Sequence, residues 1–185
     1  MSSRNGIIIV LSGEIGSGKT SLLLNLIDDL KHEELHIEGL ISPPVFTNGE
    51  KTSIDLVDLH QGQVKRLAEL NTRAIDDELS TMRWQFNAEV VDWGNQVIEK
   101  ALPCQVFIID ELGPLEFERG RGFVSAIPMI NTHDFEVAVI VVRNLLSNIA
   151  AMHWPDAEVV YLAVENRANV LSELKEKIIS ACSPG

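Results

Sequence analysis

The chain has few cysteines and no long apolar segment. Of its 185 residues only Cys104 and Cys182 are cysteines, and they lie far apart without forming a CxxC pair. A disulfide framework is therefore not expected, and both thiols should be reduced and structural. No apolar run approaches the roughly 20 residues that cross a bilayer, and the polar stretch Met1 to Gly6 leads directly into the first apolar run. We therefore expect a cytoplasmic protein that does not span a membrane.

Positive charge is also scarce. Fifteen lysines and arginines stand against 27 aspartates and glutamates, which gives a formal net charge of -12 and a pI near 4.8. Binding of nucleic acid by a basic surface is not expected, because phosphate contacts need clustered lysines and arginines. The five histidines are scattered without metal-ligand spacing, so the sequence predicts no histidine-based metal site.

The remaining composition is that of an ordinary globular protein. Apolar residues make up 45% of the chain and charged residues 23%, and no repeat or low-complexity segment is present. A chain of this length can bury a substantial core, so residues 1–185 are predicted to form a single domain.

One glycine-rich stretch has a specific spacing. Residues 13–20 read Gly13-Glu14-Ile15-Gly16-Ser17-Gly18-Lys19-Thr20, which is the G-x-x-x-x-G-K-T pattern of a phosphate-binding P-loop. The stretch follows the apolar run Ile7 to Leu11 and precedes Ser21 to Leu30, where leucines recur at helical spacing. A strand, a loop and a helix are therefore predicted. The glycines allow successive backbone N–H groups to point at one anion.

The polar side chains of this loop have expected roles toward a bound nucleoside triphosphate such as ATP or GTP. Lys19 should reach the β- and γ-phosphates, and Ser21 can donate a hydrogen bond to the α-phosphate. The Thr20 hydroxyl should ligate Mg²⁺, the expected cofactor, which bridges the same phosphates and neutralises their charge. The stretch therefore predicts a binding site for a nucleoside triphosphate with Mg²⁺.

A second motif follows the apolar run Gln105 to Ile109. The run ends in Asp110-Glu111, a Walker B pattern at the carboxyl end of a predicted strand. Because sites of open α/β sheets lie outside the carboxyl ends of the strands, Asp110 is predicted to reach the Mg²⁺ beside Thr20. Glu111 is then available as a general base that polarises the water attacking the γ-phosphate. Alone, such a pair more often ends a solvated strand, but the P-loop upstream favours the functional role.

Further strands and helices are expected along the chain. Antiparallel strands in the middle make the sheet mixed, and residues 71–83, which show no clear periodicity, are expected to form a loop. A helix capped by Asn87 should end at Pro103, and another between Arg119 and Ile127 should end at Pro128. The other expected elements are the strands Glu38–Ser42, Ser53–Leu59, Val64–Leu70, Trp84–Phe86, Glu136–Val142 and Glu158–Ala163, the helix Asn144–Met152, and a last helix with Val170, Leu171, Leu174 and Ile178 on one face.

Arg143 follows the expected strand Glu136–Val142. If this strand neighbours the Walker B strand, Arg143 emerges near the γ-phosphate and could stabilise charge in the transition state from within the same chain. The alternative is an arginine on the surface with no such role.

Three motifs together resemble one family, the small P-loop nucleoside-triphosphatases of the cancer-related nucleoside-triphosphatase type. These motifs are the P-loop, the segment DELGPLE at residues 110–116, and Glu165-Asn166-Arg167 after the last expected strand. The resemblance implies Mg²⁺-dependent hydrolysis of nucleoside triphosphates to diphosphate and phosphate. It also implies a three-layer α/β/α sandwich around a mostly parallel, mixed sheet, related to RecA-like and kinase-like P-loop proteins.

The resemblance also concerns the end and the middle of the chain. Asn166 and Arg167 are implied to contact the nucleobase or ribose, although a helix cap with a solvated arginine is the alternative. Residues 39–42 and 58–62 look similar to the family as well. Lys51 to Ile54 replace a basic, glycine-containing stretch of the family, so no family role carries over to the middle strands.

Two other functions stay open, as do the preferred base and the oligomeric state. A nucleotide or small-molecule kinase uses the same loop and metal, and Arg66, Arg73 and Arg83 could bind an acceptor. A nucleotide-dependent switch is suggested by residues 110–113, which spell D-x-x-G, but no N-K-x-D guanine motif follows. No arginine-rich lid typical of a kinase is recognisable, and Glu111 beside Asp110 favours activation of water over both alternatives.

Overall fold

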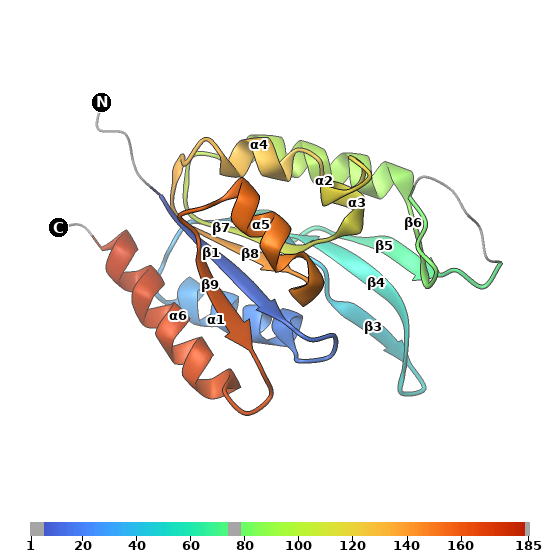
Figure 1. Ribbon diagram of the computed structural model, residues 1–185, viewed down its shortest axis with the longest axis horizontal. Helices are drawn as coiled ribbons and strands as arrows, with labels where there is room; N and C mark the ends of the chain where they lie inside the picture. The colour runs from blue at the N-terminus through green and yellow to red at the C-terminus, as the bar shows by residue number, and fades with distance from the viewer. Residues whose placement is uncertain (1–5, 74–78, 184–185) are drawn as a thin grey trace.

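The computed structural model describes residues 6–73 and 79–183, in which nine strands form one sheet (Figure 1). Part of the loop expected at residues 71–83, namely 74–78, lies outside the described residues. The strands are β1 (Ile7–Gly13), β2 (Ile37–Ile41), β3 (Pro44–Thr47), β4 (Glu50–Asp58), β5 (Val64–Leu70), β6 (Trp84–Phe86), β7 (Cys104–Leu112), β8 (Phe135–Val142) and β9 (Glu158–Leu162). The helices are α1 (Lys19–His32), α2 (Ala88–Lys100), α3 (Pro114–Phe117), α4 (Ala126–Ile130), the 3₁₀ helix η1 (Asn144–Leu146), α5 (Ser147–His153) and α6 (Arg167–Cys182).

The sheet has a parallel part and an antiparallel part. The strands β2, β7, β8, β1 and β9 lie side by side in this order and run parallel. The sequences of the central strands β1, β7 and β8 are nearly continuous apolar runs, as expected for strands that are covered on both faces. The strands β4, β5 and β6 continue the sheet beyond β2 with antiparallel pairing, and β3 pairs with β4. The predicted mixed sheet is therefore confirmed.

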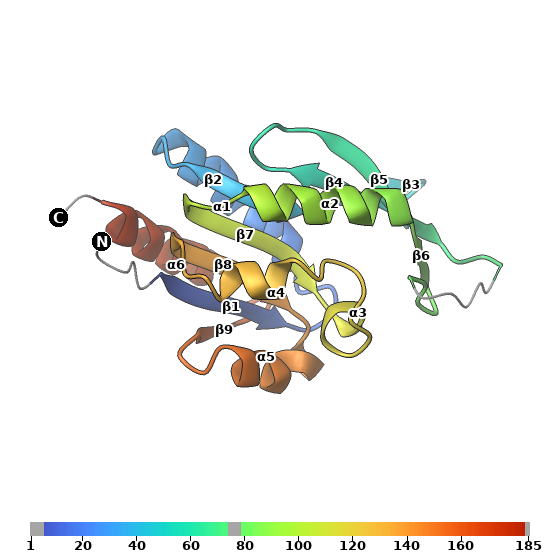
Figure 2. The same cartoon turned by 90° about the horizontal axis from the view of Figure 1, so that it is seen from above.

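Helices cover both faces of the sheet and make the predicted three layers. Alternate residues of the parallel strands point to opposite faces, so Ile9 and Leu11 belong to one apolar core and Ile8 and Val10 to the other. The helices α1 and α6 close the first core, and α2, α4 and α5 close the second. Figure 2 shows α2 and α4 on one side of the strands and α1 and α6 on the other. Val170, Leu174 and Ile178 form the buried stripe of α6, as predicted.

The strand order brings the two sequence motifs to one edge of the sheet. β8 lies between β1, which leads into the P-loop, and β7, which carries Asp110 and Glu111. Ile140 of β8 pairs with both Val10 of β1 and Ile109 of β7. Because the three strands are parallel, the P-loop, the two carboxylates and Arg143 all leave the sheet at its carboxyl edge. The expectation that the strand before Arg143 neighbours the Walker B strand is confirmed.

The structure differs from the sequence prediction at two prolines. The prediction of a helix between Arg119 and Ile127 that ends at Pro128 is wrong. The helix α4 begins only at Ala126, and Pro128 lies inside its first turn. Proline is tolerated there, since the first N–H groups of a helix have no intrahelical acceptor. Pro44 was expected to follow a strand but instead begins β3, which pairs only with β4 among the described strands. An edge strand can begin with proline because its missing N–H breaks no ladder.

Two further sequence expectations concern the cysteines and the membrane. Cys104 is buried and Cys182 half-buried, and both are free thiols. Burial raises the pKa of the Cys104 thiol to about 12, so this side chain behaves as a small apolar group. In the described part of the chain, no helix combines the length and the apolar character that a membrane span requires.

Candidate functional site

The P-loop curls around its own lysine. Gly16 and Gly18 have φ values of 84° and 88°, in the region that glycine adopts without strain, and α1 begins directly after them at Lys19. The Lys19 ammonium donates hydrogen bonds to the carbonyl oxygens of Gly13 and Glu14, each at 2.9 Å. Burial lowers the pKa of Lys19, and the nearby carboxylates of Glu111 and Asp110 act in the opposite direction. Both carboxylates therefore favour the charged form of the ammonium.

Asp110 is the buried carboxylate of the site. Only 2% of the residue is exposed, and its Oδ2 accepts a hydrogen bond from the Ser42 N–H at 3.2 Å. The Ser42 hydroxyl donates to the Asp110 carbonyl at 2.7 Å, so the end of β2 fixes this residue from both sides. Burial and the neighbouring Glu111 carboxylate raise the pKa of Asp110 to about 7, while hydrogen bonds from Ser42 and Thr20 lower it. A cation beside Asp110 would offset the cost of this buried charge.

The donor atoms around Asp110 suit Mg²⁺. The Thr20 hydroxyl and the Asp110 carboxylate line the same cavity, and both are hard oxygen ligands. Mg²⁺ is usually bound through one or two carboxylates together with phosphate oxygens. The residues predicted as metal ligands therefore lie together at the mouth of the P-loop, in an arrangement that fits the ion.

Glu111 and Arg143 form an ion pair across two neighbouring strands. Arg143 follows β8, Glu111 lies near the end of β7, and the Arg143 Nε donates to Glu111 Oε1. Both side chains are partly open to solvent, with 31% of Glu111 and 42% of Arg143 exposed. Within the described part of the chain, the second carboxylate oxygen and the terminal guanidinium nitrogens make no other hydrogen bond to protein. Sequence reasoning placed both residues near the γ-phosphate but did not foresee that they pair.

Glu14 and Ile15 lie at the exposed tip of the loop. Glu14 Oε1 accepts hydrogen bonds from the Asn144 amide at 2.8 Å and from the Tyr161 hydroxyl at 3.4 Å. Asn144 follows β8 and Tyr161 belongs to β9, so these bonds connect the loop to the two strands that flank β1. Ile15 is 86% exposed, and only its backbone can serve the phosphate site.

Arg167 contacts the P-loop, whereas Asn166 closes a turn. The Arg167 guanidinium donates to the Ser17 carbonyl at 2.7 Å, and a Cβ on Gly18 would lie 2.2 Å from one of its nitrogens. Gly18 therefore gives this arginine room to lie on the loop. The Asn166 side chain accepts from the Ala163 N–H and donates to the Tyr161 carbonyl, both within its own turn. A contact of either residue with the base or ribose stays a prediction.

Other polar groups of this region have no protein partner. Among the described residues, Ser12 Oγ, Ser17 Oγ and Arg167 Nε are buried without a hydrogen bond. Ser17 belongs to the P-loop, and Arg167 is the residue that lies on it. A buried polar group without a partner is costly, so bound phosphate or water at the loop would relieve this cost.

A small cavity of about 130 Å³ adjoins the carboxylates. Thr20, Asp110, Glu111 and Arg143 line one side of it. The other side is mainly apolar and comes from the antiparallel strands and the loop after β7, with Ile54, Leu67, Trp84, Phe86, Leu115 and Phe123. Glu116 fixes that loop by accepting hydrogen bonds from the N–H groups of Gly113 and Phe123.

Sequence reasoning missed Ser42 and Lys51 as residues of this site. Lys51 lines the cavity together with Asp110 and Glu111. Burial lowers the pKa of Lys51, and the charges of the two carboxylates act in the opposite direction. The Lys51 Nζ also lies 5.0 Å from the centre of the Trp84 ring. Ser42 could have been found as the polar residue that ends a predicted strand, but no local pattern indicates Lys51.

Comparisons with known proteins agree with this geometry. The sequence profile of the NTPase family matches residues 8–175. The nucleoside-triphosphatase THEP1 of Methanocaldococcus jannaschii is 25% identical over 93% of this chain and 97% of its own length. The nucleoside-triphosphatase THEP1 of Pyrococcus abyssi is 26% identical over 91% of this chain and 90% of its own length.

Two solved structures share the fold. A human cancer-related nucleoside triphosphatase superposes with a TM-score of 0.72 at 20% identity, covering 95% of this chain and 98% of the other. THEP1 from Aquifex aeolicus superposes with a TM-score of 0.67 at 21% identity, covering 93% and 99%. The predicted three-layer P-loop fold and the family resemblance are both confirmed.

Proposed function

The chain belongs to the NTPase family and is a nucleoside-triphosphatase, and we propose that it hydrolyses the γ-phosphate of nucleoside triphosphates with Mg²⁺ held between Thr20 and Asp110. The observation that carries this proposal is the convergence of three strand ends on one point. Lys19 follows β1, Asp110 and Glu111 end β7, and Arg143 follows β8. Mg²⁺ held by Thr20 and Asp110 would neutralise phosphate charge that otherwise repels a nucleophile.

The residues of the chain divide the work of hydrolysis. The backbone N–H groups of the P-loop and the Lys19 ammonium hold the phosphates, for which Lys19 must exchange its bonds to the Gly13 and Glu14 carbonyls. Glu111 orients the attacking water and accepts its proton through the carboxylate oxygen that Arg143 does not engage. The terminal N–H groups of Arg143 are then available to the charge that develops on the γ-phosphate.

Phosphate release measured over a Mg²⁺ titration tests this proposal. Each of ATP, GTP, CTP and UTP is incubated with the chain, and the experiment is repeated in excess EDTA. We expect phosphate and diphosphate in equal amounts, and a rate in EDTA that falls to background, because Thr20 and Asp110 would lose the ion that they hold. Hydrolysis that continues unchanged in EDTA would contradict the proposed metal site.

A second candidate function is transfer of the γ-phosphate to a hydroxyl. The observation that favours this function is the cavity lined by Glu111 and Trp84. A reaction with water alone would not need its apolar lining. Its volume of about 130 Å³ is below the range typical of drug-sized ligands, about 300–1,000 Å³, so it suits a small acceptor or one group of a larger one. Glu111 would accept the proton of that hydroxyl in the same way as that of water.

Product analysis separates the two functions. The chain is incubated with γ-labelled triphosphate, with and without a panel of nucleosides, nucleotides and small apolar alcohols, and free phosphate is separated from transferred phosphate. Label that appears only as free phosphate supports hydrolysis. Label in an acceptor, together with suppression of free phosphate, would establish transfer. The variant Trp84→Ala serves as a control, because it opens the apolar side and should reduce transfer more than hydrolysis.

A further inference from the structure

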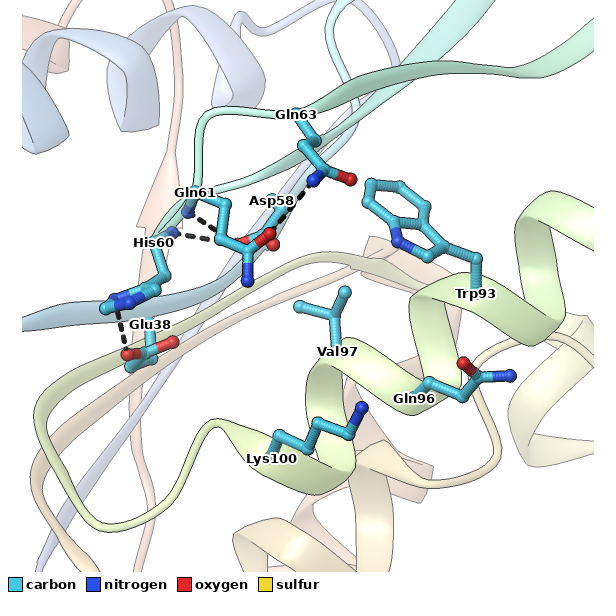
Figure 3. A pocket seen from close by; sticks show the side chains of 9 residues that line it. All are labelled: Glu38, Asp58, His60, Gln61, Gln63, Trp93, Gln96, Val97 and Lys100. Carbon is cyan, nitrogen blue, oxygen red and sulfur yellow. Dashed lines mark hydrogen bonds and ion pairs between the residues drawn. The ribbon is translucent and has the colours of Figure 1, made fainter.

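Two histidines and a buried glutamate meet at the opposite edge of the sheet from the P-loop. His36 precedes β2, Glu38 belongs to β2, and His60 lies in the turn after β4 (Figure 3 shows the last two). His36 Nε2 lies 2.7 Å and His60 Nδ1 lies 2.9 Å from the same oxygen, Glu38 Oε1. The three ligand atoms all lie within 4.8 Å of one another. Spacing along the sequence did not predict this cluster, because its residues come from separate segments of the chain.

Strand pairing explains why the three residues meet. His36 and Glu38 are two residues apart on one extended segment, so their side chains point to the same face of the sheet. In the antiparallel pair of β2 and β4, Leu40 is opposite Asp58, and continuing this register places His60 opposite Glu38. The Leu59 N–H donates to the Gly39 carbonyl at 3.1 Å, which extends the pairing beyond the end of β4.

The cluster is held in place by its neighbours. The buried carboxylate of Asp58 accepts hydrogen bonds from the N–H groups of His60 and Gln61 at 2.9 and 3.2 Å, which fixes the turn that carries His60. The His36 N–H donates to the Gln105 side chain at 2.9 Å. Glu38 is only 8% exposed, whereas the side chains of His36 and His60 are 49% and 56% exposed. A fixed carboxylate thus lies between two imidazoles that can adjust.

The donor set and the spacing suit a transition-metal dication. Two imidazole nitrogens and one carboxylate are a known ligand set for Zn²⁺, with the fourth position left to water or another ligand. Ligands bonded to Zn²⁺ at about 2.0–2.1 Å in a tetrahedron lie about 3.4 Å apart, so each imidazole nitrogen would move away from Glu38 Oε1 by less than about 1 Å. The charge of the ion would also compensate the negative charge of Glu38, which is buried with no lysine or arginine ion pair among the described residues.

A cavity of about 480 Å³ opens beside the cluster. It lies between the turn after β4 and one face of α2, from which Trp93, Gln96, Val97 and Lys100 line it, as Figure 3 shows. Glu38 and His60 line its other side. A position left open on a metal at this cluster could therefore face a space large enough for a small ligand.

The geometry points to a second metal site, in which His36, Glu38 and His60 bind one Zn²⁺ ion beside the cavity at α2. This site is distinct from the Mg²⁺ site proposed above, because the histidines lie at the amino end of β2 whereas Ser42, at its carboxyl end, contacts Asp110. The ion would join the turn after β4 to β2. Bound Zn²⁺ should therefore stabilise the fold as well as occupy the site.

Zn²⁺ binding by the metal-free chain tests this inference. The protein is stripped with EDTA, desalted and titrated with Zn²⁺ by calorimetry, and Co²⁺ is used in parallel because its visible spectrum reports the ligand geometry. We expect one Zn²⁺ per chain, and at a hundredfold excess over Kd a rise in Tm of about 5 °C or more. The variants His36→Ala and His60→Ala should each weaken binding by at least about 10- to 100-fold and abolish the Co²⁺ bands.

Matched variants separate this site from others on the chain. His32→Ala removes a histidine of α1 outside the cluster, and Asp110→Asn removes a carboxylate of the proposed Mg²⁺ site, so both should leave Zn²⁺ affinity within about twofold. Glu38→Gln retains the side-chain volume and should weaken binding, with circular dichroism as the check on folding. If no stoichiometric Zn²⁺ binds, or if binding survives in the His36→Ala/His60→Ala double variant, the cluster is only a hydrogen-bonded network and the inference fails.

Discussion

The pairing of Glu111 with Arg143 makes a sharp prediction for a double-mutant cycle. The variants are Glu111→Gln, Arg143→Ala and the combination of both. If Arg143 orients the carboxylate that activates water, then removing either residue disables the same unit. The two losses in rate should therefore not multiply in full. The double variant should be slower than either single variant, because Arg143 also meets charge on the γ-phosphate, but faster than the product of the two losses predicts.

The magnitudes separate catalysis from folding. Because 31% of Glu111 and 42% of Arg143 are exposed, the ion pair should contribute only roughly 0.2–1 kcal/mol to the free energy of unfolding. A general base typically contributes about 10² to 10⁴ in rate, which corresponds to about 2.7–5.4 kcal/mol of activation free energy. The variants should therefore fold normally, with Tm lowered by no more than a few degrees, and still lose most of their hydrolysis.

Single-turnover measurements decide the outcome. Enzyme in excess over labelled triphosphate is quenched over time, and bound triphosphate is compared with released phosphate. Glu111→Gln should bind nucleotide and Mg²⁺ as well as the wild type and accumulate the unhydrolysed complex. Arg143→Ala should also leave nucleotide affinity nearly intact. Glu118→Gln serves as the matched control, because Glu118 is an exposed acid of the loop after β7.

Two results would refute this reasoning. Losses that multiply in the double variant would show that Glu111 and Arg143 act independently in spite of their contact. A Glu111→Gln variant that hydrolyses at nearly the wild-type rate would remove the proposed general base altogether, and transfer to an acceptor in the adjoining cavity would become the better explanation of the site.

Three further substitutions follow from the contacts at the P-loop. Lys19→Ala should nearly abolish turnover and weaken nucleotide binding, because it removes the ammonium that the loop encloses, and turnover within twofold of wild type would contradict this role. Asp110→Asn should raise the Mg²⁺ concentration at half-maximal rate, whereas an unchanged Mg²⁺ titration would exclude Asp110 as a metal-side residue. Gly18→Ala should lower the unfolding free energy by about 1–2 kcal/mol, measured by urea denaturation, because its φ is 88° and the added Cβ would meet Arg167; an unchanged midpoint would contradict the packing.

Much of the fold could be predicted because the signals are local. The apolar runs that become β1, β7 and β8 and the leucine spacing of α1 each lie within about ten residues. Asn87 accepts hydrogen bonds from Glu89 and Val90 at the start of α2, as its residue type predicts for a helix cap. The prediction failed at two prolines, because proline ends helices and strands but is also tolerated at their beginnings. Pro128 lies in the first turn of α4, and Pro44 begins an edge strand.

The candidate site residues could be named from sequence, but most of their partners could not. Glu111 and Arg143 are 32 positions apart, and only the parallel pairing of β7 with β8 brings them into contact. His36 and His60 are 24 positions apart, and only the register of β2 with β4 places His60 opposite Glu38. Local spacing contains no information about register between distant strands, so an analysis of spacing finds the P-loop and overlooks the histidine cluster.

The same limit explains why the motifs alone do not separate hydrolysis from transfer. The P-loop, Asp110 and Glu111 can serve either reaction, because both reactions need bound phosphates, a metal and a base. Which of the two reactions occurs depends on the residues that line the cavity together with Glu111. In this chain they include Lys51 of β4, Leu67 of β5 and Trp84 of β6, all on the antiparallel extension of the sheet. In the proposed function, the parallel core would bind and activate the triphosphate, and the antiparallel strands would determine which nucleophile can reach it.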